Sequence, residues 1–254
     1  MASPQNRSSS FGQVAETYDR YRPAIPSEVA RWFGARAALN VLDVAAGTGL
    51  STRAFEALGC NVTAIEPDPA MLKVLKRRSA NVTAISGTAE SLDIAESTVD
   101  LEVLCSAWHW VHVPSATSEA ARVLKDGGTL GICWNGFDQR VDWVARYAEL
   151  RDSTSVTNDL GDRLGHSPQS IVLPENAPFS SPEICTIDWV WRRSLDELAL
   201  QLTTYSGIIV AGKERSEAVQ QVARELLAER VEDDGLITIP MAARCWKATR
   251  LPRA

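Results

Sequence analysis

The chain has 254 residues, of which 45% are hydrophobic and 23% are charged, and its formal net charge is −6. These values are typical of a globular protein with one large α/β domain, or a core and a small subdomain, and they exclude a disordered chain. No run of Lys and Arg stands out, so we do not expect a nucleic-acid backbone as a partner.

Apolar runs alternate with helical patterns in the first half of the chain. After a helical pattern at 11–21, strands are predicted at 41–45, 60–65, 81–85, 99–105 and 129–134, the last of them after a turn at Asp126-Gly127-Gly128. Helices are predicted between them at 50–58, 69–78 and 115–124. Strands separated by helical patterns of this length indicate parallel βαβ units.

The second half is less regular. It predicts a helix at 137–151, an irregular excursion at 152–182, a strand at 184–191, helices at 195–205 and 214–231, and a strand at 236–246. The predicted fold is α/β: a Rossmann-like, doubly wound, mostly parallel seven-stranded sheet with helices on both faces and a helical lid. We divide it into an N-terminal lid with the first helices (1–40), a βαβ core (41–136), a lid or insertion (137–183) and C-terminal strands and helices that complete the sheet and the acceptor pocket (184–254).

The most informative motif is Asp43-x-x-x-Gly47-x-Gly49, which follows the first predicted strand. Glycines there allow a tight turn and a close approach of a ligand, and a helix that begins near Leu50 directs free N–H groups at that ligand. Glu66 ends the second strand, 19 residues after Gly47. A carboxylate at that position can accept hydrogen bonds from both hydroxyls of a ribose.

Two features favour a sulfonium cofactor over a dinucleotide in this turn. The third glycine of a dinucleotide fingerprint is replaced by the bulkier Thr52. Asp43 places a carboxylate close to the turn, which suits an ammonium and a sulfonium better than two phosphates.

Five segments, in the right order, resemble the motifs of class I S-adenosylmethionine-dependent methyltransferases. They are Val41–Gly49, Val62–Leu72, Ser86–Leu92, Val99–Val103 and Ala121–Leu130. A looser match, in Phe11-Gly12, Tyr18–Pro23 and Ser106–Trp110, is similar to the small-molecule branch of this superfamily, which includes trans-aconitate methyltransferase-like proteins and unassigned bacterial members. The C-terminal half carries no motif that we can name.

The resemblance implies S-adenosyl-L-methionine as cofactor and a set of residues around it. Glu66 would hold the ribose, Ala89 would contact the adenine through its backbone, and Tyr18 and Arg22 would reach the methionine carboxylate. Thr88 stands where the family usually has Asp, and a hydroxyl can still bond to the adenine amino group. The whole predicted cofactor set is Tyr18, Arg22, Asp43, Ala45, Ala46, Gly47, Thr48, Gly49, Glu66, Pro67, Asp68, Met71, Thr88, Ala89, Glu90, Cys105 and Ser106.

The acceptor is expected near the end of the fourth strand. His109 is the candidate general base for a hydroxyl or amine acceptor, although we favour a packing or substrate-shaping role for it, and a carboxylate acceptor would need no base. Trp108 and Trp110 would line the pocket or simply pack in the core. Asn135 either contacts the substrate or is a turn residue, and we favour the turn.

The composition also bounds the partners. The five cysteines are interpreted as buried reduced thiols, and with only three histidines available we expect no metal site. Residues 1–10 lack the apolar segment of a signal peptide, and no stretch approaches the ~20 apolar residues of a membrane helix. We therefore expect a cytoplasmic monomer or homodimer whose only other partner is a small-molecule methyl acceptor, with neither nucleic acid nor membrane bound.

The preferred function is methyl transfer from S-adenosylmethionine to a small-molecule O or N acceptor, a carboxylate among them, by direct displacement. One alternative is a nicotinamide-dependent oxidoreductase on the same topology. Another is a non-catalytic cofactor-binding protein, which the departure at Thr88 would suit.

Overall fold

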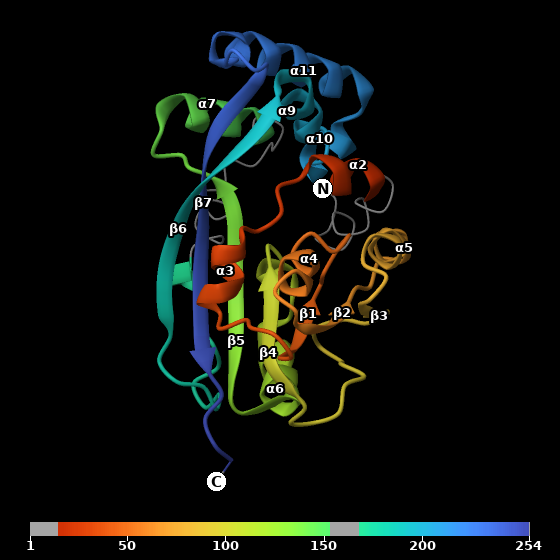
Figure 1. The fold of residues 1–254 in the computed structure, drawn as a ribbon, viewed down its shortest axis with the longest axis vertical. Coiled ribbons are helices and arrows are strands. Elements are labelled where there is room, and N and C mark those ends of the chain that lie inside the picture. Colours follow the sequence, from red (N-terminus) through yellow and green to blue (C-terminus); the bar gives the residue numbers. More distant parts are fainter. Residues whose placement is uncertain (1–14, 153–167, 254) are drawn as a thin grey trace. The chain divides into compact units, whose positions relative to one another are not determined.

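The computed structural model describes residues 15–152 and 168–253. Its sheet has seven strands in the order β3-β2-β1-β4-β5-β7-β6 (Figure 1). The strands are β1 (Asn40–Val44), β2 (Asn61–Ile65), β3 (Thr83–Ile85), β4 (Val99–Cys105), β5 (Leu124–Phe137), β6 (Glu183–Ser194) and β7 (Leu236–Thr249). The β3-β2, β2-β1, β1-β4 and β4-β5 pairs are parallel, whereas the arrow of β7 points opposite to that of β5. The predicted Rossmann-like, mostly parallel sheet is confirmed.

The helices of the described residues connect these strands. They are α2 (Ala15–Tyr21), α3 (Ser27–Trp32), α4 (Thr52–Glu56), α5 (Pro69–Arg78), α6 (Val113–Val123), α7 (Asp142–Asp152), α9 (Leu195–Leu202), α10 (Ser206–Ala211) and α11 (Lys213–Leu227), with short 3-10 turns η2 (Trp108–Trp110), η3 (Pro168–Ser170) and η4 (Ala228–Arg230). None of the described helices is long and apolar enough to cross a membrane.

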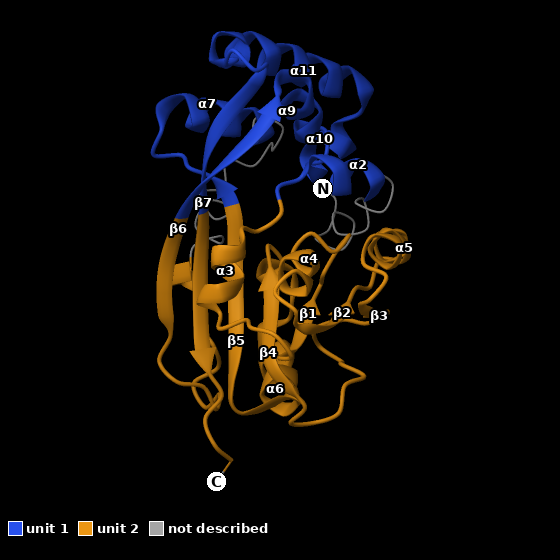
Figure 2. Cartoon of the chain, in the orientation of Figure 1, with its two compact units in different colours: residues 1–23, 136–159, 188–242 blue, residues 24–135, 160–187, 243–254 orange. Residues whose placement is uncertain are grey.

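The chain divides into two compact units (Figure 2). Unit 1 comprises residues 1–23, 136–159 and 188–242, and unit 2 comprises residues 24–135, 160–187 and 243–254. Unit 2 contains the predicted cofactor turn. The predicted N-terminal segment 1–40 is split, because α2 belongs to unit 1 and α3 to unit 2.

The core of unit 2 lies on both faces of the sheet. On one face, Ile65 and other strand residues pack against α6 through Ala120 and Val123. On the other face, Ala64 packs with Leu75 of α5. Because neighbouring residues of a strand point to opposite faces, Ala64 and Ile65 show that helices cover both sides.

Unit 1 has its own apolar core, built from α7, α9, α10, α11 and the adjoining parts of the long strands. Tyr147 is fully buried there, and its hydroxyl donates to the carbonyl of Leu198 at 2.7 Å. Helix α9 begins with a capping box, in which the Ser194 hydroxyl accepts from the Glu197 N–H and the Glu197 carboxylate accepts from the Ser194 N–H.

Helix α5 lies where the sequence predicts it because its first turn is capped locally. Helix α5 covers the predicted residues 69–78 because the Asp68 carboxylate accepts from the N–H groups of Ala70 and Met71, and Pro69 occupies the first turn. The predicted turn at Asp126–Gly128 lies within the bounds of β5. Gly127 has a φ of +78°, and the register with β4 shifts there from Val99 opposite Leu124 to Leu101 opposite Thr129, so β5 contains an irregularity at the predicted turn.

Other boundaries differ for equally local reasons. The helix expected at 137–151 begins only at Asp142, because Phe137 ends β5 and is buried. Helices α3 and α10, of six residues each, were not predicted, since elements this short carry little periodic signal. The part of the expected irregular excursion at 153–167, with His166, lies outside the described residues, as do Phe11 and Gly12.

The cysteines only partly match the expectation of buried thiols. All five are free, and Cys133 and Cys245 are buried with their sulfurs 3.7 Å apart. Cys60, Cys105 and Cys185 are half-buried instead. No group of three or more metal-ligating side chains gathers among the described residues.

One buried carboxyl in unit 2 lies outside the predicted site. Glu102 of β4 is 2% exposed, and its Oε2 has no hydrogen-bond partner within the described part of the chain. Burial raises the pKa of Glu102 to about 8, with the charge of Glu119 adding to the rise and that of Arg122 opposing it. The folded protein therefore holds a neutral Glu102 at neutral pH.

This buried carboxyl predicts a pH-dependent stability. Above pH 4.5 the Glu102 carboxyl ionises in the unfolded chain but stays protonated in the folded one. The ionisation stabilises the unfolded state, so the free energy of unfolding falls as the pH rises from about 4.5 to about 8. Glu102→Gln removes this ionisation, so the stability of the variant relative to the native chain should rise by about 2.5 kcal/mol between pH 5 and pH 7. Urea unfolding at the two pH values measures the difference, with Glu225→Gln on the exposed face of α11 as control. An equal pH response in native and Glu102→Gln chains would contradict the prediction.

Candidate active site

The carboxyl ends of the parallel strands of unit 2 bring the predicted site segments to one edge of the sheet. Val44 at the end of β1 pairs with Ile65 of β2, and Cys105 of β4 pairs with Cys133 of β5. The chain leaves these strands at the Asp43–Gly49 turn, at Glu66 and at Ser106. This is the edge at which open α/β sheets bind ligands.

The turn after β1 uses left-handed backbone at three positions. Ala45, Gly47 and Gly49 have φ values of +55°, +59° and +85°. A Cβ added to Gly47 would meet no atom within 4 Å, whereas one added to Gly49 would lie 3.1 Å from Cγ of Leu75. Gly47 therefore keeps a space open, and Gly49 allows close packing of the turn against α5.

Asp43 lies fully buried beneath this turn. Its Oδ2 accepts hydrogen bonds from Ser51 at 2.8 Å and from Thr52 at 2.6 Å. Its Oδ1 has no partner among the described residues, and neither has the buried hydroxyl of Thr48. Burial raises the pKa of Asp43 to about 6, against the opposing hydrogen bonds of Thr52 and Ser51. The residue that breaks the dinucleotide pattern, Thr52, thus serves as a partner of Asp43.

Glu66 connects the ends of β1 and β2. Its Oε2 accepts from the N–H of Gly47 and its Oε1 from the N–H of Asp68, both at 2.8 Å. Burial raises the pKa of Glu66, opposed by these same two hydrogen bonds. Each oxygen retains acceptor capacity, so the carboxylate can take two hydroxyl donors while the backbone fixes its position.

The residues predicted around the adenine have structural partners of their own. The Asp68 carboxylate caps α5, Met71 is buried on that helix, and Pro67 between Glu66 and the helix is exposed. Ala89 is buried, and Glu90 accepts from the N–H of His112 at 2.8 Å. Partial burial would raise the pKa of Glu90, but the bonds from His112 and from the Thr88 hydroxyl lower it overall.

The segment after β4 carries the predicted acceptor pocket. Ser106 is exposed, has a φ of +57°, and donates its N–H to the Cys133 carbonyl at 2.6 Å. Trp108 is buried, whereas His109 and Trp110 are exposed with their ring centroids 4.6 Å apart. Burial raises the pKa of the Cys105 thiol, which also has a hydrogen bond with Ser51.

Two β5 residues extend this edge. Trp134 Nε1 donates to Nδ1 of His109 at 3.4 Å, which joins β5 to the 3-10 turn after β4. The Asn135 amide donates to the carbonyl of Ala24, ahead of α3, at 2.9 Å. Asn135 lies within β5, so its interpretation as a turn residue was wrong.

Known proteins with related sequences identify this chemistry. Residues 42–132 match the model of a methyltransferase domain. An uncharacterized methyltransferase of Mycobacterium tuberculosis is 33% identical over 252 residues, which is 97% of this chain and 98% of the relative. The chain belongs to the methyltransferase family. It is a class I S-adenosylmethionine-dependent enzyme, and the alternatives of an oxidoreductase and of a non-catalytic binding protein are set aside.

Solved structures of methyltransferases share the fold. A putative type II methyltransferase from Anaeromyxobacter dehalogenans has a TM-score of 0.65 at 21% identity, over 92% of this chain and 100% of that one. Phosphoethanolamine N-methyltransferase 2 of Haemonchus contortus, solved with phosphomonomethylethanolamine and S-adenosylhomocysteine, has a TM-score of 0.57 at 13% identity. The match covers 99% of this chain and 61% of the nematode enzyme.

The residues of the turn fit this methyltransferase cofactor. The open space over Gly47 accommodates a close ligand, and the spare acceptor positions of Glu66 suit the two ribose hydroxyls. The partnerless Oδ1 of Asp43 and hydroxyl of Thr48 are buried polar atoms that a polar ligand would satisfy. The roles of the individual predicted residues remain predictions.

Tyr18 and Arg22 belong to unit 1 and are engaged within it. The Arg22 guanidinium donates to the Thr204 hydroxyl at 2.8 Å and to its carbonyl at 3.3 Å, and it stacks 3.6 Å from the ring centroid of Tyr205. It also lies 5.1 Å from the ring centroid of Tyr18. Their contact with the cofactor carboxylate stays a prediction.

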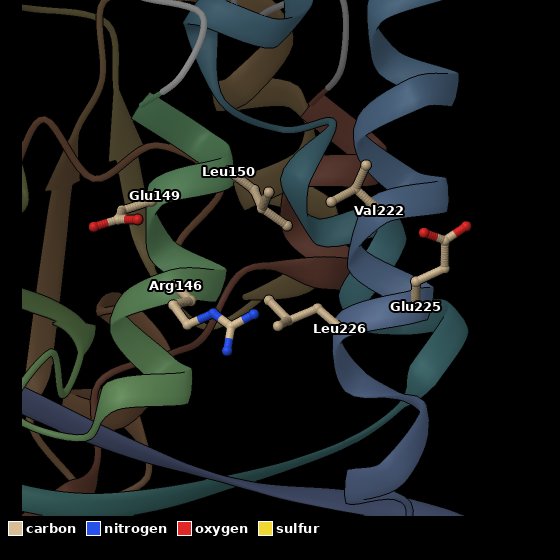
Figure 3. A pocket seen from close by; sticks show the side chains of 6 residues that line it. All are labelled: Arg146, Glu149, Leu150, Val222, Glu225 and Leu226. Atoms are coloured by element: carbon tan, nitrogen blue, oxygen red, sulfur yellow. The ribbon is translucent and has the colours of Figure 1, made fainter.

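Unit 1 also has a cavity that contains no predicted site residue. It has a volume of about 550 Å³ and lies between α7 and α11. Figure 3 shows the apolar side chains of Leu150, Val222 and Leu226 turned toward this space, while the carboxylates of Glu149 and Glu225 point away from it. Arg146 completes the lining.

The burial of Asp43 predicts a pH dependence of cofactor binding. A ligand ammonium favours the ionised carboxylate, so below a pKa of about 6 binding must first remove a proton, and affinity should fall by up to tenfold per pH unit. In Asp43→Asn the affinity should be lower at pH 7.5 and this component of the pH dependence should disappear. Titrations with S-adenosylhomocysteine from pH 5 to pH 8 measure both effects. A variant that keeps the native pH profile would show that Asp43 does not interact with the ligand charge.

Proposed function

We propose that the enzyme transfers a methyl group to an O or N atom of a small molecule. The observation that carries this proposal is the imidazole of His109, which contacts the ring of Trp110 and accepts a hydrogen bond from Trp134, close to the carboxyl ends of β4 and β5. One polar group among aromatic rings suits a compact organic acceptor. A protein of the same fold binds phosphomonomethylethanolamine together with S-adenosylhomocysteine, so this fold accommodates a small acceptor.

The chain's own residues mainly bind and orient. S-adenosylmethionine supplies, when bound, an electrophilic methyl group on a sulfonium that is its own leaving group. Glu66 would fix the ribose, Asp43 would favour the positive charge, and the glycine turn would allow close approach. The aromatic rings after β4 would exclude water and align the acceptor atom, which is the main requirement of a direct displacement.

An acceptor panel tests the proposal. The purified enzyme is incubated with S-adenosylmethionine and carboxylates, phenols, alcohols or amines, and release of S-adenosylhomocysteine is followed, with Glu66→Ala as a cofactor-site control. We expect turnover with one small-molecule class, and none by the variant. Methyl incorporation confined to RNA or protein, with no small molecule methylated, would contradict the proposed acceptor class.

A further inference from the structure

The contact between Trp134 and His109 has a defined direction. An indole Nε1 carries a hydrogen and has no lone pair to offer, so it can only donate. Its partner is Nδ1 of His109, at 3.4 Å. Nδ1 must therefore present a lone pair, which a neutral imidazole has on only one of its two nitrogens.

This direction fixes the tautomer. With Nδ1 as acceptor, the single proton of the neutral ring is on Nε2. A ring with its proton on Nδ1, or an imidazolium, would turn an N–H toward the indole N–H and break the contact. Trp134 is 5% exposed and held in β5, so it cannot readily turn away from the ring.

We propose that Trp134 is a positioning residue of the methyl-transfer site. It holds His109 in the tautomer with the proton on Nε2, so that His109 acts toward the acceptor as a hydrogen-bond donor and not as a base. The inference rests on the proposed function, because it assigns a role to the same edge of the sheet.

A donor at this position constrains the reaction. An N–H on Nε2 can donate to an oxygen or nitrogen of the acceptor, but it cannot take a proton from a hydroxyl or an ammonium. The reacting atom therefore offers a free lone pair without help from His109, as a carboxylate oxygen or a neutral amine nitrogen does. The bond from that atom to the methyl carbon forms as the carbon–sulfur bond breaks, the electron pair of the broken bond stays on sulfur, and His109 gains no proton.

Nitrogen-15 NMR of histidine-labelled full-length enzyme tests the tautomer directly. The chain has three histidines, so the spectrum contains the ring nitrogens of three residues only, and the spectrum of His109→Gln identifies the His109 signals by their loss. At a pH where the ring is neutral, we expect His109 to show a protonated Nε2 and an unprotonated Nδ1. Trp134→Phe should move the His109 signals toward a mixture of the two tautomers.

A second tryptophan gives the matched control. Trp246 is 2% exposed, and its Nε1 has no hydrogen-bond partner among the described residues. Trp246→Phe should therefore leave the His109 tautomer unchanged. A native enzyme with its proton on Nδ1 of His109, or a Trp134→Phe variant with the native tautomer ratio, would overturn the proposal. The native spectrum decides the first point even if Trp134→Phe does not fold.

The acceptor panel, run with the same native enzyme, separates the two proposals. Turnover of a small molecule together with the wrong tautomer would reject the role of Trp134 and leave the proposed function standing. Methylation confined to RNA or protein together with the expected tautomer would reject the proposed function, and the fixed imidazole would then be a structural feature only.

Discussion

Glu66→Ala should weaken the binding of S-adenosylhomocysteine by about 100-fold or more. The Glu66 carboxylate is fixed by the N–H groups of Gly47 and Asp68, and each of its oxygens retains acceptor capacity for a ribose hydroxyl. Hydrogen bonds to a charged group contribute about 1.5–3 kcal/mol each, so loss of two of them costs about 3 kcal/mol or more of binding free energy. Isothermal titration of native and variant enzyme measures the change.

The control is another buried carboxyl of unit 2. Glu102 on β4 is even more buried than Glu66, and it lies opposite Leu42 of β1, which is not one of the predicted cofactor residues. Glu102→Gln should bind S-adenosylhomocysteine with native affinity. A Glu66→Ala variant that also binds with native affinity would remove Glu66 from the cofactor site.

The two glycines of the turn should respond in opposite ways to alanine. In Gly47→Ala the new Cβ meets no protein atom, so the protein loses only the roughly 1–2 kcal/mol of a left-handed alanine, while the methyl group enters the space assigned to the cofactor. We expect cofactor affinity to fall by about 100-fold or more, because even a single methyl group cannot share a close-packed contact.

In Gly49→Ala the new Cβ would lie 3.1 Å from Leu75 Cγ, at a φ of +85°. Overpacking and backbone strain together should cost about 3 kcal/mol of unfolding free energy. Thermal unfolding without ligand and titration with S-adenosylhomocysteine separate the two variants. If Gly47→Ala lowers stability more than Gly49→Ala and leaves affinity intact, the assignment of the open space is wrong.

The sequence predicts the part of the site that depends on local motifs. Asp43, Gly47 and Gly49 follow one strand and Glu66 ends the next, and parallel strands bring their carboxyl ends to one edge. The hydrogen bond from Gly47 to Glu66 is the structural result of that pattern. Helix α5 was placed at its observed bounds for a similar reason, because Asp68 and Pro69 mark its start.

Other contacts depend on residues that are distant in the chain. Ser51 and Thr52 were missed as partners of Asp43, since Thr52 stood out only as the loss of a glycine. Trp134 and His109 are 25 residues apart, and the register of β4 with β5, which places Cys105 opposite Cys133, brings them together. The sequence did contain a signal for this contact. The segment with His109 directly follows the predicted strand 99–105, and Trp134 ends the predicted neighbouring strand 129–134.

Arg22 shows where no sequence signal was available. Its partner Thr204 is 182 residues away, in a short segment between α9 and α10. Nothing in the pattern around Arg22 or Thr204 predicts their pairing, because no strand register or helical spacing connects them. Such pairings follow only from the packing of unit 1.

We propose that the Asp43–Gly49 turn and Glu66 hold the methyl donor. Isothermal titration of the native enzyme with S-adenosylhomocysteine, and in parallel with NADH, tests it most directly. The structure predicts saturable one-to-one binding of S-adenosylhomocysteine that Glu66→Ala and Gly47→Ala abolish or strongly weaken, and no binding of NADH. Absence of S-adenosylhomocysteine binding by the folded native enzyme, or binding that neither substitution changes, would contradict it.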